Sequence, residues 1–185
     1  MSANKWVALE EESGKVFVVQ TTADTVKIKG LGVFNPAELL SEKNVGETVV
    51  IGQKILTILT PRLPELYRGM KRRAQTISAK DAGVLITKLG IGPGDVILEA
   101  GLGSGGLSLH LARVLGNSGT LLTIETRDEH AEVGLENLAR AKQCLPEFPD
   151  HHHISGDISD VSMKITDLAG QVDGIILDLP NHQPA

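Results

Sequence analysis

The stretch Glu99-Ala100-Gly101-Leu102-Gly103-Ser104-Gly105-Gly106 decides the fold of this 185-residue chain. It follows a short apolar run over residues 96–100 and precedes a segment of helical periodicity over residues 106–115. The glycines form the pattern Gly-x-Gly-x-x-Gly, which permits a tight turn and lets a ligand approach bare backbone. A strand, a glycine-rich turn and the amino end of a helix, in that order, predict a nucleotide-binding site.

Strands and helices alternate through the second half of the chain. We expect helices over residues 78–89, 106–115 and 128–142, with a weaker one over 161–168. We expect strands over residues 96–100, 120–125, 152–155 and 174–179. This alternation predicts βαβ units and therefore a parallel sheet, an α/β fold of the Rossmann-like kind.

The first third of the chain has a different pattern. Short β-branched runs over residues 6–9, 16–19, 26–28, 48–51 and 55–59 are separated by turn residues. They predict a small all-β N-terminal domain over residues 1–60. Pro61 and Pro64 then open a basic linker over residues 61–76, and the Rossmann-like domain occupies residues 77–185.

Composition excludes several classes of protein. Hydrophobic residues make up 41% of the chain and charged residues 22%, which supports a packed core. No apolar run is long enough for a membrane-spanning helix, and the N-terminus lacks the apolar segment of a secretory signal. The single cysteine, Cys144, fits a cytoplasmic location. Three consecutive histidines, His151 to His153, point to alternate faces of a strand, so no metal site is expected.

Charge is unevenly distributed along the chain. The net charge is −5, which argues against an indiscriminate nucleic-acid binder. Positive charge nevertheless gathers around the linker, at Arg62, Arg68, Lys71, Arg72 and Arg73. These residues are candidates for phosphate contacts with RNA, the alternative being a solvated linker face.

Acidic residues close the predicted strands and narrow the choice of ligand. Glu125 ends the strand after the glycine loop, where a carboxylate can accept both hydroxyl groups of a ribose. Glu99 lies just before the glycines, separated from them by Ala100, and suits a positively charged ligand group, such as the amino group of a methionine moiety, better than a pyrophosphate. A nicotinamide-dependent dehydrogenase is therefore the least favoured hypothesis for the function.

Two of these patterns resemble known methyltransferase motifs. The sequence Glu-x-Gly-x-Gly-x-Gly from Glu99 is similar to the first motif of S-adenosylmethionine-dependent methyltransferases. Gly156-Asp157 fits the position of the residue that, in that family, accepts a hydrogen bond from the adenine amino group of the donor. Asp178-Leu179-Pro180 resembles the motif of methyltransferases that act on the nitrogens of bases.

Longer segments make the resemblance specific. Lys71-Arg72-Arg73-Ala74-Gln75-Thr76-Ile77-Ser78-Ala79-Lys80-Asp81, together with EAGLGSGGLSLHLAR at residues 99–113, resembles the tRNA (adenine-58)-N1 methyltransferase family. The resemblance implies a homotetrameric enzyme that uses S-adenosylmethionine to methylate N1 of an adenine in the tRNA T loop. It also implies the fold, a class I methyltransferase sheet that is truncated here after its fourth strand.

The resemblance assigns roles residue by residue. Asp178 matches the catalytic aspartate, which would accept a hydrogen bond from the adenine amino group and orient N1. The residues that would bind the methyl donor are Gln75, Glu99, Gly101, Gly103, Ser104, Gly105, Gly106, Leu107, Glu125, His130 and Asp157.

The chain departs from the family's pattern at its end. The family's Asp-x-Pro-x-Pro-Trp continues here as Asp178-Leu179-Pro180-Asn181-His182-Gln183-Pro184-Ala185, without the aromatic residue. The fourth strand, residues 174–179, would also form an exposed apolar edge. Two alternatives therefore stay open: a non-catalytic tRNA-binding partner subunit, and a class I methyltransferase of another substrate, such as damaged aspartates in proteins.

Overall fold

The chain forms two compact units in the computed structural model, Met1–Met70 and Lys71–Ala185. The structure describes residues 6–161 and 170–179. The division between the units falls inside the segment expected to be a linker, and the three-part organisation stays a prediction. No helix within the described ranges is long and apolar enough to cross a membrane.

The first unit is built on an antiparallel sheet with the strand order β2-β1-β6-β5, and a separate ladder pairs β3 with β4. Its strands are β1 (Trp6–Glu11), β2 (Val16–Gln20), β3 (Val26–Ile28), β4 (Gly32–Phe34), β5 (Thr48–Ile51) and β6 (Lys54–Leu59). Two short helices, α1 (Pro36–Leu39) and α2 (Leu63–Arg68), complete it. Strand β4 and helix α1 were not expected, because their glycine and proline residues are typical of turns.

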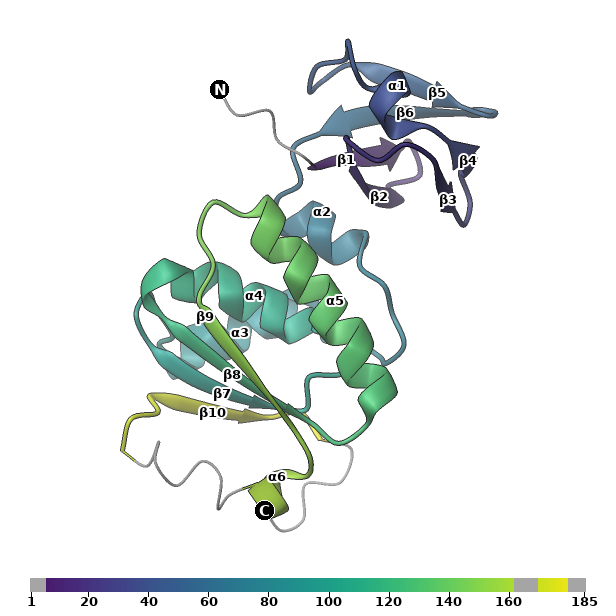
Figure 1. Cartoon of the computed structure of the whole chain (residues 1–185). Coiled ribbons are helices and arrows are strands. Elements are labelled where there is room, and N and C mark those ends of the chain that lie inside the picture. Colours follow the sequence, from purple (N-terminus) through teal and green to yellow (C-terminus); the bar gives the residue numbers. More distant parts are fainter. Residues whose placement is uncertain (1–5, 162–169, 180–185) are drawn as a thin grey trace. The chain divides into compact units, whose positions relative to one another are not determined.

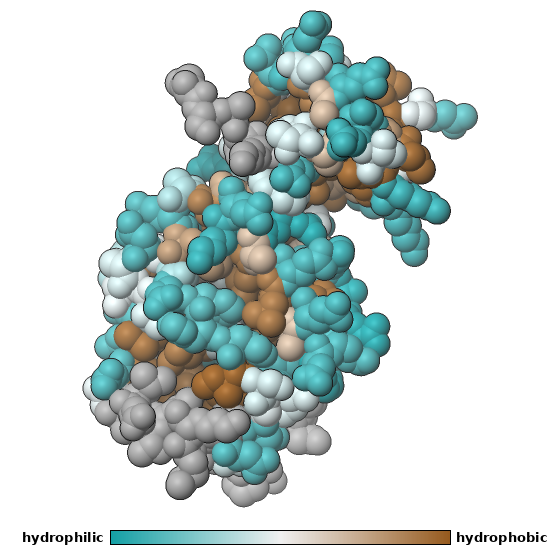
Figure 2. Space-filling model, in the orientation of Figure 1, coloured by the Kyte–Doolittle hydropathy of each residue, from teal (hydrophilic) through white to brown (hydrophobic). Residues whose placement is uncertain are grey.

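One face of this sheet forms the core of the first unit. Leu9, Leu56 and Ile58 are almost fully buried, whereas Val50 and Ile55 are exposed. Side chains alternate between the two faces of a strand, so one face packs and the other meets solvent. Figure 2 shows the hydrophobic side chains that this leaves at the surface of the unit.

The second unit contains a parallel sheet with the strand order β10-β7-β8-β9. Its strands are β7 (Val96–Ala100), β8 (Thr120–Glu125), β9 (Asp150–Ser155) and β10 (Gly174–Leu177). Its helices are α3 (Ala79–Leu89), α4 (Gly106–Leu115), the 3₁₀ turn η1 (Gly116–Ser118), α5 (Asp128–Cys144) and α6 (Ile158–Val161). Figure 1 shows α3, α4 and α5 on the same face of the sheet. The α/β fold with a parallel sheet of these four strands confirms the expectation from the sequence.

The two faces of the sheet bury separate sets of side chains. Ile97 and Leu121 pack with Leu111 of α4, whereas Leu98 and Leu122 face the opposite side. Strands buried on both faces read as nearly continuous apolar runs, and that pattern made β7 and β8 recognisable in the sequence.

Strand β10 lies at the edge of the parallel sheet and pairs with β7 alone among the described strands. Ile175 and Leu177 are 58% and 41% exposed, in line with the expected apolar edge. Ile176 is only 7% exposed, because the alternation of side chains turns it into the core below α4.

Several element boundaries differ from the expectations; β10, for example, ends at Leu177 and not at residue 179. Helix α6 begins at Ile158, earlier than the weak helix expected over residues 161–168, most of which lies outside the described residues. Strand β9 starts at Asp150 and so includes all three histidines. The residues that follow Leu179 also lie outside the described part, and with them the departure from the family's motif after Pro180.

Candidate functional site

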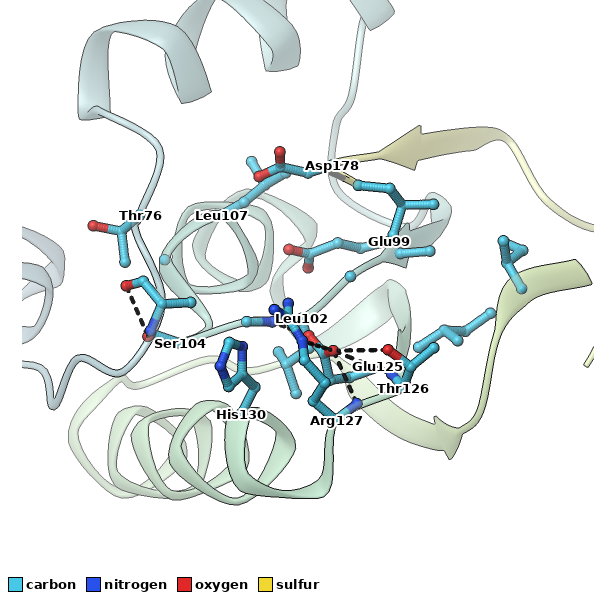
Figure 3. A pocket seen from close by; sticks show the side chains of 18 of the residues that line it. Thr76, Glu99, Leu102, Ser104, Leu107, Glu125, Thr126, Arg127, His130 and Asp178 are labelled. Atoms are coloured by element: carbon cyan, nitrogen blue, oxygen red, sulfur yellow. Dashed lines mark hydrogen bonds and ion pairs between the residues drawn. The ribbon is translucent and has the colours of Figure 1, made fainter. Parts of the chain in front are cut away.

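A pocket of about 720 Å³ opens in the second unit at the carboxyl ends of the four parallel strands. Figure 3 shows acidic side chains from successive strands turned toward it. Ligands of open α/β sheets bind at this edge, since the strand order reverses there and leaves a crevice. Eleven residues selected from the sequence line the pocket: Gln75, Glu99, Gly101, Gly103, Ser104, Gly106, Leu107, Glu125, His130, Asp157 and Asp178.

The glycine loop between β7 and α4 approaches neighbouring groups too closely for side chains. A Cβ on Gly101 would lie 3.2 Å from Oε2 of Glu125. Gly105 adopts φ +77° at the cap of α4, and a Cβ there would lie 3.2 Å from the carbonyl oxygen of Gly134. Gly105 thus packs against α5 and is the one predicted donor-binding residue that does not line the pocket.

Glu125, the last residue of β8, is held by a set of hydrogen bonds. Its Oε2 accepts from the backbone N–H of Gly103 at 2.8 Å, and its Oε1 accepts from the backbone N–H of Arg127 at 3.1 Å. The Arg127 side chain forms an ion pair with the same Oε1 at 3.2 Å. Burial raises the pKa of Glu125, but these donors outweigh it and hold the pKa below 4.5. The carboxylate is therefore ionised and fixed in the pocket wall.

Glu99 is in a very different environment. Its side chain is 1% exposed, and its Oε2 accepts a hydrogen bond from the Ser108 hydroxyl at 2.5 Å. Burial raises the pKa of Glu99 to about 8, because removal from water disfavours the charged form. Two carboxyl groups in one pocket thus differ in their preferred charge.

Asp157 and Asp178 are the other two acidic residues that line the pocket. Oδ1 of Asp157 accepts from the backbone N–H and the hydroxyl of Ser159, at 2.9 Å and 2.6 Å, and so caps α6. The Ser159 hydroxyl bond lowers the pKa of Asp157. Asp178 directly follows β10, is exposed, and donates its backbone N–H to Ala100 at 2.6 Å. Its carboxylate is therefore open to a ligand.

A segment that we call the strap, residues 71–77, runs beside the glycine loop. The Ser104 hydroxyl accepts from the backbone N–H groups of Arg73 and Ala74, at 3.0 Å and 2.9 Å. The Asn137 side chain, from α5, accepts from the N–H of Lys71 and donates to the carbonyl of Ser104. The strap is thus fastened to the loop, and residues 74–77 form part of the pocket wall.

His130, near the start of α5, carries an unsatisfied polar atom. Its Nδ1 is buried, and no hydrogen-bond partner lies among the described residues. His130 lines the pocket. An unpartnered buried nitrogen in a pocket wall is costly, so a ligand that bonds to it would recover that cost.

A family model described as the tRNA methyltransferase complex GCD14 subunit matches residues 54–185. The chain belongs to this family. The tRNA (adenine(58)-N(1))-methyltransferase TrmI of Thermus thermophilus is 34% identical over 146 residues, covering 78% of this chain and 54% of that protein. The tRNA (adenine(57)-N(1)/adenine(58)-N(1))-methyltransferase TrmI of Methanocaldococcus jannaschii is 31% identical, covering 67% and 50%.

Solved structures support the fold. An S-adenosylmethionine-dependent O-methyltransferase from Thermotoga maritima superimposes with a TM-score of 0.65 at 29% identity, over 86% of this chain and 58% of that one. The tRNA (m1A58) methyltransferase TrmI from Aquifex aeolicus gives 0.61 at 22% identity, over 86% and 60%. The class I methyltransferase fold is thereby confirmed. This GCD14 family chain spans about half the length of the curated relatives it matches.

The basic residues selected as RNA contacts are largely paired with carboxylates. In the second unit of this GCD14 family chain, Lys71 pairs with Glu136 at 2.6 Å and Arg73 with Glu129 at 2.8 Å. In the first unit, Arg68 bonds to Glu10 and Glu65, and Arg62 precedes α2. Arg72 is exposed and also makes an interaction. RNA contact at these residues stays a prediction.

Sequence reasoning missed several residues of this site. Arg127, Thr126 and the strap residues Thr76 and Ile77 line the pocket without having been selected. Arg127 could have been found, since a cation two residues after a ribose-binding carboxylate is expected to contact it. Ser108 and Asn137 gave no such signal, being isolated polar residues within helices.

The histidines of β9 contact Thr123, a buried residue of β8. Its hydroxyl bonds to Nε2 of His151 at 2.9 Å and to Nδ1 of His153 at 3.0 Å. Residues 6–161 and 170–179 contain no group of three His, Cys, Asp or Glu side chains able to hold a metal.

Proposed function

We propose that this chain forms the S-adenosylmethionine-binding part of a methyltransferase that modifies N1 of an adenine in the tRNA T loop. One observation carries the proposal. Glu99, Glu125, Asp157 and Asp178, each near the carboxyl end of a different parallel strand, line one pocket beside a glycine loop. The named activity of the relatives supports this proposal.

The pocket offers a partner for each part of S-adenosylmethionine. We assign the ammonium group of its methionine part to Glu99, the ribose hydroxyls to Glu125 and the adenine amino group to Asp157. A Cβ on Gly101 would crowd Oε2 of Glu125, so the glycine keeps the carboxylate assigned to the ribose free of a neighbouring side chain. The unpartnered Nδ1 of His130 provides a further bonding position.

Asp178 is the catalytic residue of this proposal. When bound, S-adenosylmethionine supplies a methyl group on a positively charged sulfur. The lone pair of adenine N1 forms the new bond to the methyl carbon while the carbon–sulfur bond breaks and its electrons pass to sulfur. Because N1 has a free lone pair, the step needs no general base. Asp178 accepts a hydrogen bond from the adenine amino group, which orients N1 and stabilises the positive charge left on the base.

The assembly and location belong to the proposal as well. We infer tRNA as partner, a homo-oligomer of four chains and a cytoplasmic location, as the resemblance of residues 71–113 implies. The exposed edge of β10 is compatible with completion of the sheet by further polypeptide.

A second candidate is a methyltransferase of another substrate. The ion pairs of Arg68, Lys71 and Arg73 favour it, since paired cations contribute less to phosphate binding. The resemblance to an O-methyltransferase structure points the same way.

The experiment is transfer of a radiolabelled methyl group to unmodified tRNA, followed by nucleoside analysis. We expect 1-methyladenosine as product and no product with Asp178→Ala, which should bind the donor within a few-fold of the wild-type affinity. Loss of donor binding in this variant would remove Asp178 from the catalytic role. Absence of 1-methyladenosine together with methylation of another acceptor would favour the second candidate.

A further inference from the structure

Glu99 sits at the floor of the pocket without a balancing cation. Among the described residues, no lysine, arginine or histidine acts on its carboxyl group. Its side chain is 1% exposed, and Figure 3 shows the carboxyl group aimed into the pocket. A buried carboxylate that lacks a cation is costly, so the group holds its proton instead.

The neighbours of Glu99 act in opposite directions. Burial raises its pKa to about 8, the hydrogen bond from Ser108 opposes the rise, and the charge of Asp178 adds to it. The other titratable groups lining the pocket are Glu125, Arg127, His130 and Asp157. Among the described residues only Asp178 acts on Glu99 appreciably by charge, so a cationic group of a ligand would be the charge that favours the ionised form.

Ser108 lies behind this carboxyl group. It is completely buried on α4, and its hydroxyl bonds to Oε2 of Glu99 at 2.5 Å. Ser108 is not part of the pocket wall. Its hydroxyl therefore cannot serve the ligand directly, but it holds Oε2 of Glu99, and the backbone N–H of Ser108 also bonds to this carboxyl group.

We propose, resting on the proposed function, that Glu99 and Ser108 form a proton-coupled subsite for the ammonium group of the methyl donor. The carboxyl group of Glu99 is protonated in the empty pocket and releases its proton to solvent when the ammonium group docks. Ser108 is a positioning residue that holds Oε2. Donor binding is consequently linked to pH, whereas binding of the nucleoside part alone is not.

The test is calorimetric titration of the 185-residue chain with S-adenosylmethionine in phosphate and in Tris, whose ionisation enthalpies differ. At pH 7 we expect release of about one proton per ligand bound, and a rise of about tenfold in the association constant between pH 6 and pH 7. Adenosine, which lacks both positive charges of the donor, is the control ligand and should bind without proton release.

Two variants test whether Glu99 is the source of the released proton and whether Ser108 positions its carboxyl group. Glu99→Gln should bind the donor more weakly, release almost no proton and lose the pH dependence. Ser108→Ala should bind the donor about tenfold more weakly at pH 7 while binding adenosine as the wild-type chain does, because only the carboxyl group has lost its support. A purely structural defect would weaken both ligands equally.

The outcomes separate this inference from the proposed function. Donor binding without proton release, or equal proton release by Glu99→Gln, would overturn the subsite and leave the proposed function standing. Equal weakening of donor and adenosine by Ser108→Ala would overturn the positioning role. A folded wild-type chain that binds no donor would overturn the proposed function itself.

Discussion

The side-chain amide of Asn137 donates a hydrogen bond to the carbonyl oxygen of Ser104 at 2.9 Å and another to that of Lys71 at 2.8 Å. Its Oδ1 accepts from the N–H of Lys71 at 3.0 Å. One buried side chain on α5 thus connects the strap to the glycine loop. The position of the pocket wall depends on a residue that does not itself line the pocket.

Asn137→Ala should therefore destabilise the second unit and weaken donor binding. The substitution leaves the buried carbonyl of Ser104 and the backbone of Lys71 without their partners, at a cost of about 1–3 kcal/mol. Urea unfolding followed by helical circular dichroism measures the loss. Glu132→Ala, at an exposed position of the same helix, is the matched control and should change stability little. Equal midpoints for the two variants would contradict the connecting role of Asn137.

Two helical glycines should respond to alanine in opposite directions. A Cβ on Gly134 would lie 2.6 Å from Cγ of Leu102 and 2.9 Å from the carbonyl oxygen of Gly103. Gly134→Ala should therefore push α5 away from the glycine loop. Such overpacking costs about 1–3 kcal/mol. A Cβ on Gly83 of α3 would meet nothing within 4 Å, so Gly83→Ala should stabilise the chain by about 0.5–1 kcal/mol through helix propensity. Thermal unfolding of both variants checks the two signs.

The local patterns of the sequence predicted the sheet and most of the pocket. Glu99, Glu125, Asp157 and Asp178 could be selected because each lies close to the carboxyl end of a strand, and parallel strands bring their carboxyl ends together. Periodicity likewise located α4 and α5, and the residue types at Ser78 and Asp81 predicted the start of α3, where Ser78 accepts from the N–H of Asp81.

Contacts between distant segments could not be predicted in this way. Asn137 bonds to groups 33 and 66 positions away in the sequence, and no local pattern encodes such a pairing. The same holds for the ion pair of Lys71 with Glu136, which turns a cation selected for RNA toward a helix. Ser108 acquired its role only because the first turn of α4 lies against the carboxyl end of β7.

Glu125 should make the second unit sensitive to acid. Its pKa in the folded chain is held below 4.5, so the unfolded chain binds more protons as the pH falls. The stabilisation is complete above that ordinary value and is lost as the pH falls through the folded value. Glu125→Gln replaces an acceptor of the Gly103 N–H and should cost about 1–3 kcal/mol at pH 7. Urea midpoints should show that the loss of stability relative to the wild-type chain becomes smaller below pH 4. A loss that stays constant with pH would contradict the lowered pKa of Glu125.

His151 should produce a separate loss of stability at a higher pH. Burial lowers its pKa from 6.5 to about 4, and the nearby His153 and His152 act in the same direction. Between these values the unfolded chain binds a proton that the folded chain excludes, so stability decreases as the pH falls from 6.5 to about 4. His151→Gln should reduce the dependence of stability on pH in this range, whereas His152→Gln, at a side chain that is 58% exposed, should not.

Helical circular dichroism follows the second unit, since α3, α4 and α5 belong to it, and the fluorescence of Trp6, the single tryptophan, follows the first. The effect of His151→Gln should appear in the transition followed by circular dichroism alone. An equal shift of the transition followed by Trp6 fluorescence would show that the protonation does not act through the second unit specifically.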